Sequence, residues 1–202
     1  MNKEIEAKFL HVDFNDIRHR LTGLGAVLEQ PMRLMRRALI DTPEMIAGGR
    51  DAFIRIRDEG NRVTVTFKEF KANTLDGAEE REIVVSNFDD ALEIFAEAGL
   101  KYRSFQESKR ETWRLGETEI VLDEWPWLDT YIEVEAPTED LVKGVSKKLG
   151  FTWDQAIFGS VDRAYKEQYP GMEGRGAIDL PEVRFGDPLP DIFKSSINKS
   201  VQ

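Results

Sequence analysis

The sequence predicts an α+β protein whose β-sheet curves until it closes on itself, with a charged interior and helices packed on the outside. The main observation is that about eight segments alternate charged and apolar residues with a period of two, which gives each strand one charged and one apolar face. If all charged faces pointed outward, the apolar faces would still need cover, and the three predicted helices can cover only part of them. Closing the sheet therefore places the charged faces in a lumen and the apolar faces under the helices.

The first strand, residues 1–9, shows this pattern most clearly. Glu4, Glu6 and Lys8 point to one face, whereas the residues between them are apolar. A face that only meets water tolerates almost any polar residue and has no need to consist entirely of charge. The charged face therefore indicates a binding surface, with a solvated surface as the alternative. The later strands decide between these two interpretations.

The other strands are predicted from alternation and from turn residues. Glu59-Gly60-Asn61 is a hairpin turn, Gly116 joins two further strands, and Thr42-Pro43 ends the strand before it. The predicted strands after the first are 32–41, 52–58, 62–70, 80–85, 105–115, 119–125 and 131–135.

The helices are predicted from capping residues, apolar residues at helical spacing, and a glycine at the end of each helix. Each of them follows a strand that carries two acidic residues at positions i and i+2, which indicates a repeated supersecondary unit. The predicted start and stop residues are Asp13 and Gly25, Ser86 or Asn87 and Gly99, and Pro137-Thr138 and Gly150.

Composition narrows the class of protein. The chain has no cysteine, which excludes disulfides and thiolate metal sites. No apolar run approaches the ~18 residues of a membrane span, and charge begins at Lys3, so we expect a cytoplasmic protein without a signal peptide. A formal net charge of −10 disfavours nonspecific binding to nucleic acid.

Charges of both signs on the same strands indicate an internal site. Buried charges are costly unless they pair with each other or with a ligand. Carboxylates bind Mg²⁺ or Mn²⁺, and Arg and Lys bind phosphate oxygens, so the pattern favours a polyphosphate together with a divalent cation. The acidic pairs are Glu4/Glu6, Glu80/Glu82 and Glu133/Glu135, and the cations gather at Arg33, Arg36, Arg37, Arg55, Arg57, Lys68, Lys109 and Arg110.

The order of these motifs resembles that of CYTH-domain proteins, the triphosphate tunnel metalloenzymes. Residues 4–8, Glu-Ile-Glu-Ala-Lys, are similar to the ExExK signature of that family, and the similarity runs to about Tyr165. The motifs that follow are Arg55-Ile56-Arg57, Thr66-Phe67-Lys68, Lys109-Arg110, Asp123 and Glu133-Val134-Glu135.

The resemblance implies an eight-stranded antiparallel β-barrel tunnel with a polar lumen, within a CYTH domain at residues 1–170. It implies catalytic roles for Lys8, Glu4 and Glu6. The implied ligands of Mg²⁺ or Mn²⁺ are Glu4, Glu6, Glu133 and Glu135, with Asp123, Glu80 and Glu82 as further candidates. The implied phosphate contacts are Lys8, Arg55, Arg57, Lys68 and Arg110, to which we add Arg37 and Lys109 as substrate-binding candidates.

Some positions depart from the family pattern. Ser108 stands where a lysine is common, Leu39 where a tyrosine is common, and Arg37 at an inward position that is often acidic. Val84 likewise replaces an acid, which leaves the register of the acidic strand open. These differences leave the triphosphate site intact and the identity of the triphosphate open.

Three functions fit this pattern: a metal-dependent triphosphatase, a class IV adenylyl cyclase, and a noncatalytic module that binds polyphosphate or nucleotide. The expected partner is a small-molecule triphosphate, with a homodimer as a further option and no nucleic acid or membrane. Residues 171–202 are rich in Pro and Gly and predict an extended C-terminal arm. That arm could close one end of the tunnel, contact a partner subunit or lie on the surface.

Overall fold

The computed structural model describes residues 5–47, 49, 52–70, 78–172, 174 and 176–197. One antiparallel sheet dominates them, with strand order β1-β8-β7-β6-β2-β3-β4-β5. Its strands are β1 (Ile5–Leu10), β2 (Val27–Ile40), β3 (Ala52–Asp58), β4 (Val63–Phe70), β5 (Ala78–Val85), β6 (Ser104–Leu115), β7 (Thr118–Trp125) and β8 (Leu128–Ala136). None of the helices described is long and apolar enough to cross a membrane.

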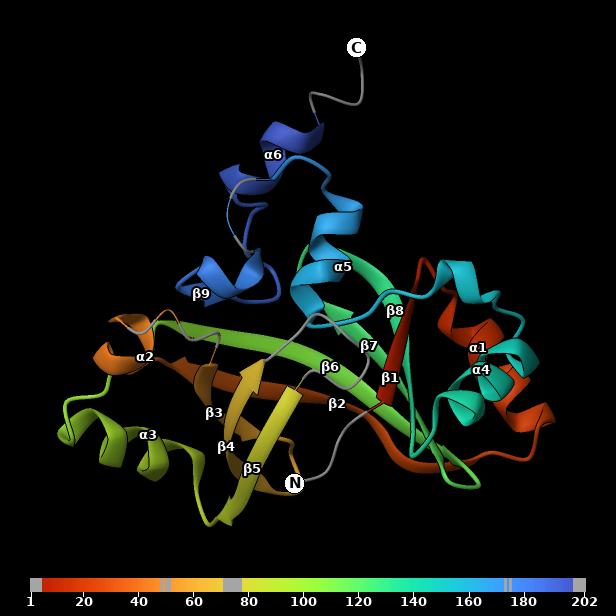
Figure 1. Ribbon diagram of the computed structural model, residues 1–202, viewed down its shortest axis with the longest axis horizontal. Coiled ribbons are helices and arrows are strands. Elements are labelled where there is room, and N and C mark those ends of the chain that lie inside the picture. Colours follow the sequence, from red (N-terminus) through yellow and green to blue (C-terminus); the bar gives the residue numbers. More distant parts are fainter. Residues whose placement is uncertain are drawn as a thin grey trace.

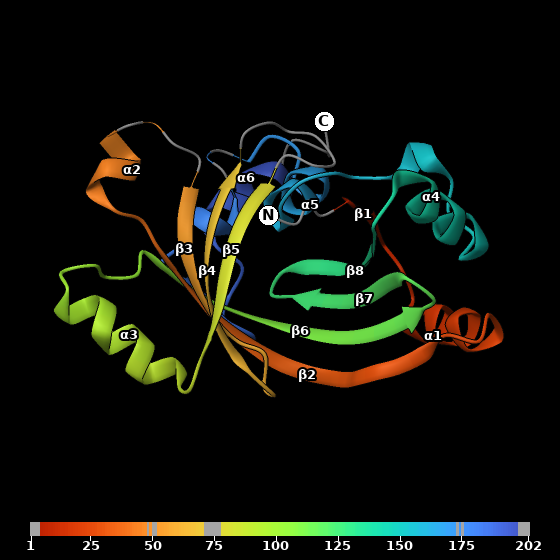
Figure 2. The same cartoon turned by 60° about the horizontal axis from the view of Figure 1, so that its bottom comes forward.

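The sheet is strongly curved. In Figure 2, β3, β4 and β5 stand steeply against β2 and β6, while β7 and β8 continue the sheet on the other side. The antiparallel sheet predicted from the sequence is confirmed, but its closure into a barrel is not. Among the residues described, no ladder joins β1 to β5, and at Lys8 the free edge of β1 pairs instead with Ile157 through two backbone hydrogen bonds of 2.9 Å.

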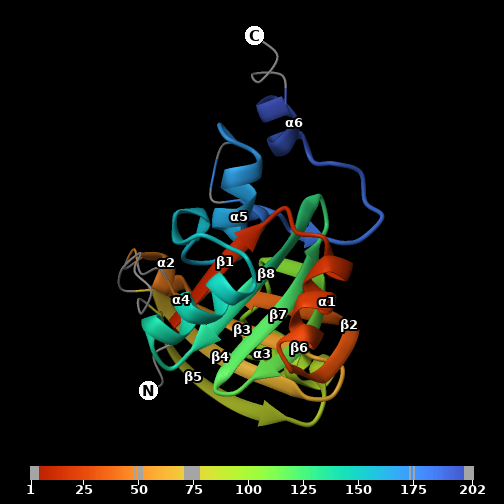
Figure 3. The ribbon, with the colours of Figure 1, turned by 90° about the vertical axis from the view of Figure 1, so that its right-hand side faces the viewer.

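Helices cover the apolar outer face of the sheet, as the alternation predicts. Helices α1 (Phe14–Gly23) and α4 (Glu139–Lys148) lie outside β1, β7 and β8 (Figure 1; Figure 3). Between them is a core that includes Phe9, Ile132 and Val142, all almost completely buried. Helix α3 (Phe88–Glu97) packs on β3, and the short helix α2 (Pro43–Ala47) follows β2.

The predicted helix caps are confirmed. Asp13, Asn87 and Thr138 accept hydrogen bonds from backbone N–H groups of the first turns of α1, α3 and α4.

Strand β2 begins at Val27, earlier than the predicted residue 32, because its pairing with β6 continues through two register shifts. Pro31 lies in this irregular part and lacks the N–H that a regular ladder needs, which hid the strand in the sequence.

The C-terminal region is more folded than the extended arm that its composition predicts. A 3₁₀ turn at Trp153–Gln155 and helix α5 (Val161–Gln168) come before residue 171. From there on, the predicted arm contains a 3₁₀ turn at Ala177–Asp179, β9 (Glu182–Val183) and α6 (Asp191–Ile197). Strand β9 pairs in parallel with β6. Phe193 of α6 is fully buried, and its ring centroid lies 5.3 Å from that of Tyr165 and 4.7 Å from that of Tyr169. The isolated apolar residues of the tail therefore belong to a core.

This packing predicts that α6 stabilises the whole domain. Phe193→Ala should lower the free energy of unfolding by about 3–5 kcal/mol, since it empties a closed aromatic site. Urea denaturation followed by tryptophan fluorescence measures the change. Lys194→Ala, which alters the exposed neighbour, is the matched control and should stay within about 0.5 kcal/mol of the unmodified protein. Equal stability of both variants would show that α6 is a detachable arm.

Candidate functional site

The concave face of the sheet collects most of the predicted site residues. Strand registers place charged residues of neighbouring strands opposite each other: Lys8 faces Glu133, Arg110 faces Asp123, and Lys68 faces Glu80. The described members of this face are Glu6, Lys8, Arg37, Arg55, Arg57, Lys68, Glu80, Glu82, Arg110, Asp123, Glu133 and Glu135. Glu4 lies outside the described residues.

On the side formed by β1 and β8, Lys8 is buried between carboxylates. Its Nζ lies 2.5 Å from Oε1 of Glu6 and 3.2 Å from Oε1 of Glu133. Burial alone lowers the pKa of Lys8, but the charges of Glu133 and Glu6 raise it above its usual value. Burial likewise raises the pKa of Glu133, yet Lys8 and Arg110 bring it down to about 2. Both groups are therefore charged at neutral pH.

Arg110 connects this side to β7. Its guanidinium donates to both carboxylate oxygens of Asp123, at 2.7 and 2.5 Å, and to Oε2 of Glu133 at 2.9 Å. Asp123 is 1% exposed and also accepts from the Tyr131 hydroxyl at 3.2 Å. Burial raises the pKa of Asp123 despite the opposing charge of Arg110. Asp123 thus holds Arg110 in place with both of its oxygens.

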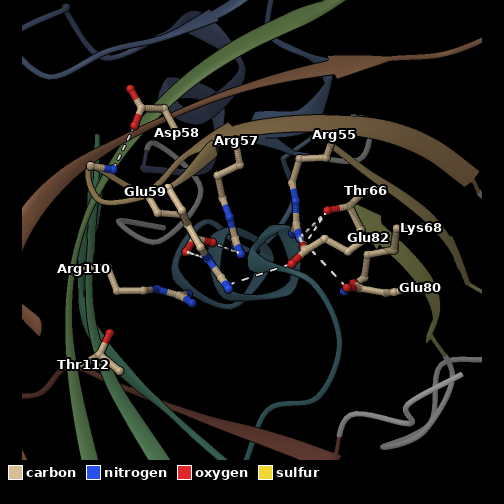
Figure 4. Close-up of polar contacts among 12 residues, drawn as sticks. Arg55, Arg57, Asp58, Glu59, Thr66, Lys68, Glu80, Glu82, Arg110 and Thr112 are labelled. Carbon is tan, nitrogen blue, oxygen red and sulfur yellow. Dashed lines mark hydrogen bonds and ion pairs between the residues drawn. The ribbon is translucent and has the colours of Figure 1, made fainter. Parts of the chain in front are cut away.

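The side formed by β3, β4 and β5 carries cations on β3 and β4 and carboxylates on β5 (Figure 4). Lys68 forms an ion pair with Glu80, and Arg55 lies 4.0 Å from Glu80 and 3.9 Å from Glu82. Glu82 also accepts from Thr66 Oγ1 at 2.8 Å. The acidic strand therefore faces the cations of its neighbours, which keeps Glu80 and Glu82 away from the carboxylates of β1 and β8.

Arg37 and Arg57 lie opposite each other on β2 and β3. The negative groups around them do not fully offset the cost of burying their positive charges. Burial is the main cause that lowers the pKa of each to about 10, and neighbouring arginines add to the effect. Nε of Arg57 and Oγ1 of Thr64, on facing positions of β3 and β4, are buried without a hydrogen-bond partner among the residues described. An anion with several oxygens fits such a surface.

Two further residues organise this face: Glu59, which sequence reasoning missed, and Arg33, which it placed among the clustered cations without a specific role. Glu59 belongs to the predicted hairpin turn but is 6% exposed and pairs with Arg57 and Arg62. Arg33 donates to the carbonyl oxygens of Glu59 at 2.9 Å and of Arg110 at 3.1 Å. The only sequence signal is an acid that directly follows an Arg-x-Arg strand, which a turn residue explains equally well.

The tail covers one end of the concave face. Gln106 and Ser104 of β6 donate to the carbonyl oxygens of Ala177 and Leu180, at 3.3 and 2.6 Å. Nearby, the guanidinium of Arg37 lies 4.3 Å from the ring centre of Trp125. At the opposite end, beside the β3–β4 turn, the side chain of Arg62 is 50% exposed. The tail therefore contacts one end of the face, whereas the half-exposed Arg62 marks the rim at the other.

The structure also places the remaining positions that the sequence singled out. Lys109 does not join the concave face: it points to the outer side, where Nζ lies 2.9 Å from Glu124 and 4.4 Å from the ring centre of Phe185. Ser108 and Leu39 do occupy inward positions, opposite Met35 and Arg55. Val84 faces Thr64, which fixes the register that the sequence left open.

The family model described as the CYTH domain matches residues 2–156. The chain belongs to the CYTH family. Residues from 157 onward, including α5 and the tail, lie outside that match.

Solved structures show the same fold as this CYTH protein. A protein from Pyrococcus horikoshii OT3 is 22% identical with a TM-score of 0.63, and the alignment covers 76% of this chain and 94% of that one. A proposed adenylate cyclase from Vibrio parahaemolyticus is 13% identical with a TM-score of 0.66, covering 82% and 98%. A proposed adenylyl cyclase from Hippeastrum, described as having a dominant triphosphatase activity, is 16% identical with a TM-score of 0.52, covering 79% and 91%. The comparison with curated proteins found no match.

Members of the CYTH family are typically enzymes that depend on a divalent metal. The donors suited to such an ion here are the carboxylates of β1 and β8, where Glu6 faces Glu135 and Glu133 lies two residues away. Their oxygen chemistry fits Mg²⁺ or Mn²⁺. Among the residues described, however, no three acidic or histidine side chains gather as a ready-made metal cluster. Lys8 and Arg110 hold Glu6 and Glu133 instead.

The lowered pKa of Glu133 predicts a specific acid sensitivity. Its charged form stabilises the fold above pH 4.5, the ordinary value, and this contribution is lost as the pH falls toward about 2. Glu133→Gln should therefore be less stable than the unmodified protein at pH 7, with the difference shrinking as the pH falls through that window. Urea denaturation at a series of pH values measures it. Glu139→Gln, on an exposed helix face, should show no such convergence.

Proposed function

We propose that this CYTH protein is a divalent-metal-dependent phosphohydrolase that acts on a triphosphate: inorganic tripolyphosphate, a nucleoside triphosphate or thiamine triphosphate. The observation that carries the proposal is the uneven neutralisation of the concave face. Carboxylates gather on β1 and β8, whereas Arg37 and Arg57 keep positive charge that no nearby carboxylate fully offsets. A triphosphate supplies the missing negative charge, and a cation satisfies the carboxylates.

In this proposal, Arg55, Arg57 and Lys68 bind phosphate oxygens, since they project from adjacent strands onto one surface (Figure 4). Arg110 approaches the same space from β6, held by Asp123. Positive groups fixed before the substrate arrives stabilise the charge that develops on the leaving phosphate. Lys8 remains protonated because its pKa is raised, so it orients and neutralises oxygens and does not accept a proton.

Glu6, Glu133 and Glu135, together with Glu4, would hold Mg²⁺ or Mn²⁺. When bound, the ion would supply a further positive charge to the phosphate oxygens. A ligand role requires ionised carboxylates, and the low pKa of Glu133 keeps that group ionised. For Glu6 and Glu133 this role also requires Lys8 to turn from the carboxylates toward the phosphate.

A class IV adenylyl cyclase is the second candidate. It is favoured by the structural relatives from Vibrio parahaemolyticus and Bacillus halodurans, both described as proposed adenylate cyclases. The same cations and carboxylates would hold ATP while its ribose 3′-hydroxyl attacks the α-phosphorus and pyrophosphate leaves. A noncatalytic module that binds polyphosphate or nucleotide is the third candidate, favoured by the inward Ser108 and Leu39.

Product analysis separates the three candidates. The protein is incubated with Mg²⁺ or Mn²⁺ and, separately, with ATP, thiamine triphosphate and tripolyphosphate, and the products are resolved by chromatography. We expect orthophosphate from at least one substrate and none in the presence of EDTA. Cyclic AMP with pyrophosphate would instead identify a cyclase. Tight binding of a triphosphate without any product would identify a binding module.

A pair of lysine variants tests the concave face. Lys68→Gln should lower kcat/KM for the preferred triphosphate by about 10- to 100-fold, because it removes one charge-assisted contact to phosphate. Lys109→Gln removes the same charge from the outer face and should leave kcat/KM unchanged. Steady-state kinetics and melting temperatures of both variants provide the measurement. Equal activity of the two would place the phosphate contacts elsewhere.

A further inference from the structure

Glu59 is buried at a position where a glutamate is normally solvated. It begins the turn between β3 and β4, which is closed by a hydrogen bond from its N–H to the carbonyl oxygen of Arg62 at 2.9 Å. Gly60, with φ of +84°, lets the chain reverse there. The side chain folds back into the concave face and is not left in water. Such burial is costly unless each oxygen is paired.

Two arginines pair with the two carboxylate oxygens of Glu59. Arg57 contacts Oε1, and Nε of Arg62 donates to Oε2 at 2.7 Å. Burial by itself raises the pKa of Glu59, but Arg57 and Arg62 lower it overall, so the group is ionised at neutral pH. The hydrogen bond from Arg33 to its carbonyl oxygen fixes the backbone of the turn as well.

Glu59 only partly neutralises Arg57. The buried Nε of Arg57 has no partner among the residues described, and burial together with Arg55 keeps the pKa of Arg57 low even though Glu59 opposes this. The preceding carboxylate, Asp58, points to the other side, where it accepts from Arg36 at 2.8 Å. Figure 4 shows Glu59 and Arg57 directed toward the space that Arg110 enters, and Asp58 directed away from it.

We propose that Glu59 is an internal competitor of the substrate: its carboxylate binds Arg57 as a phosphate oxygen would, and it must give way before Arg57 can bind a triphosphate. This inference rests on the proposed function. Arg62, half exposed at the rim, keeps the displaced carboxylate paired, because it already holds the other oxygen. The cost of displacing Glu59 is the same for every anion that binds Arg57, so Glu59 lowers the affinity of each such anion by the same factor.

Calorimetric titration of the full chain with tripolyphosphate tests this competition. Titrations run in EDTA and in Ca²⁺ compare the unmodified protein with Glu59→Gln and Asp58→Asn. Glu59→Gln should bind about 10-fold more tightly, which corresponds to about 1.4 kcal/mol. Asp58→Asn removes the same charge from the same turn on the outer side and should bind as the unmodified protein does. Orthophosphate bound at Arg57 should gain by a similar factor, because it displaces the same carboxylate.

Thermal unfolding gives a second readout. Without ligand, Glu59→Gln should melt at a lower temperature, because Arg57 and Arg62 lose their partner, and tripolyphosphate should raise its melting temperature more than that of the unmodified protein. If Glu59→Gln does not fold, Glu59→Asp replaces it: the shorter arm draws the charge away from Arg57 and should give a smaller tightening in the same direction.

The outcomes separate the two proposals. If the unmodified protein binds tripolyphosphate but the Glu59 variants bind it equally well or more weakly, Glu59 positions Arg57 and the competition is refuted. An equal tightening in Asp58→Asn would also refute it, because net charge alone would then explain the effect. If the unmodified protein binds none of tripolyphosphate, ATP and thiamine triphosphate under either condition, the proposed function itself fails.

Discussion

The requirement to neutralise charge inside a curved sheet governs this structure. Lys8, Glu133, Arg110 and Asp123 form a continuous chain of ion pairs across β1, β8, β6 and β7. None of these groups is well solvated, so each depends on its neighbours for a counter-charge. The apolar faces of the same strands pack under α1 and α4, so the sheet cannot expose its charged face without also disturbing the core. The packing of the core and the pairing of charges therefore hold the same strands in the same positions.

Neutralisation is uneven, and that unevenness gives the concave face its chemistry. Around Lys8 and Arg110, close carboxylates raise the pKa of both cations. Around Arg37 and Arg57, burial dominates and the pKa falls. The first region is suited to exchanging an internal cation for a metal ion, and the second to receiving an anion. A ligand that brings both charges at once, such as a metal-bound triphosphate, matches the two regions together.

The segments outside the family match contact one end of this face. Carbonyl oxygens of the tail accept hydrogen bonds from the side chains of Ser104 and Gln106. Asp162 of α5 accepts a hydrogen bond from the backbone N–H of Ile178 at 3.0 Å. The end near the tail is thereby filled with polar contacts and the aromatic cluster of Phe193. At the other end, beside the β3–β4 turn, lie the buried Glu59 and the half-exposed Arg62.

Local rules in the sequence were sufficient for β1 to β8, for helices α1, α3 and α4, and for most of the concave face. Alternation identified strands such as β3 and the inward direction of Arg55 and Arg57, because a period of two allows only two faces. Capping by Asp13 marked a helix for the same local reason. The resemblance to the CYTH family supplied the expected chemistry of these residues, and the family match confirmed the membership.

Long-range contacts decided the rest. Whether the sheet closes depends on which backbone meets the free edge of β1, and Ile157 at that edge is invisible in the local pattern. Lys109 and Arg110 are adjacent cations, yet only the register with β7 sends Arg110 inward to Asp123. The role of Glu59 depends on the turn folding back onto Arg57. Sequence alone fixed which side chains share a strand face, whereas tertiary structure decided which charges meet, because that depends on distances between strands remote in the chain.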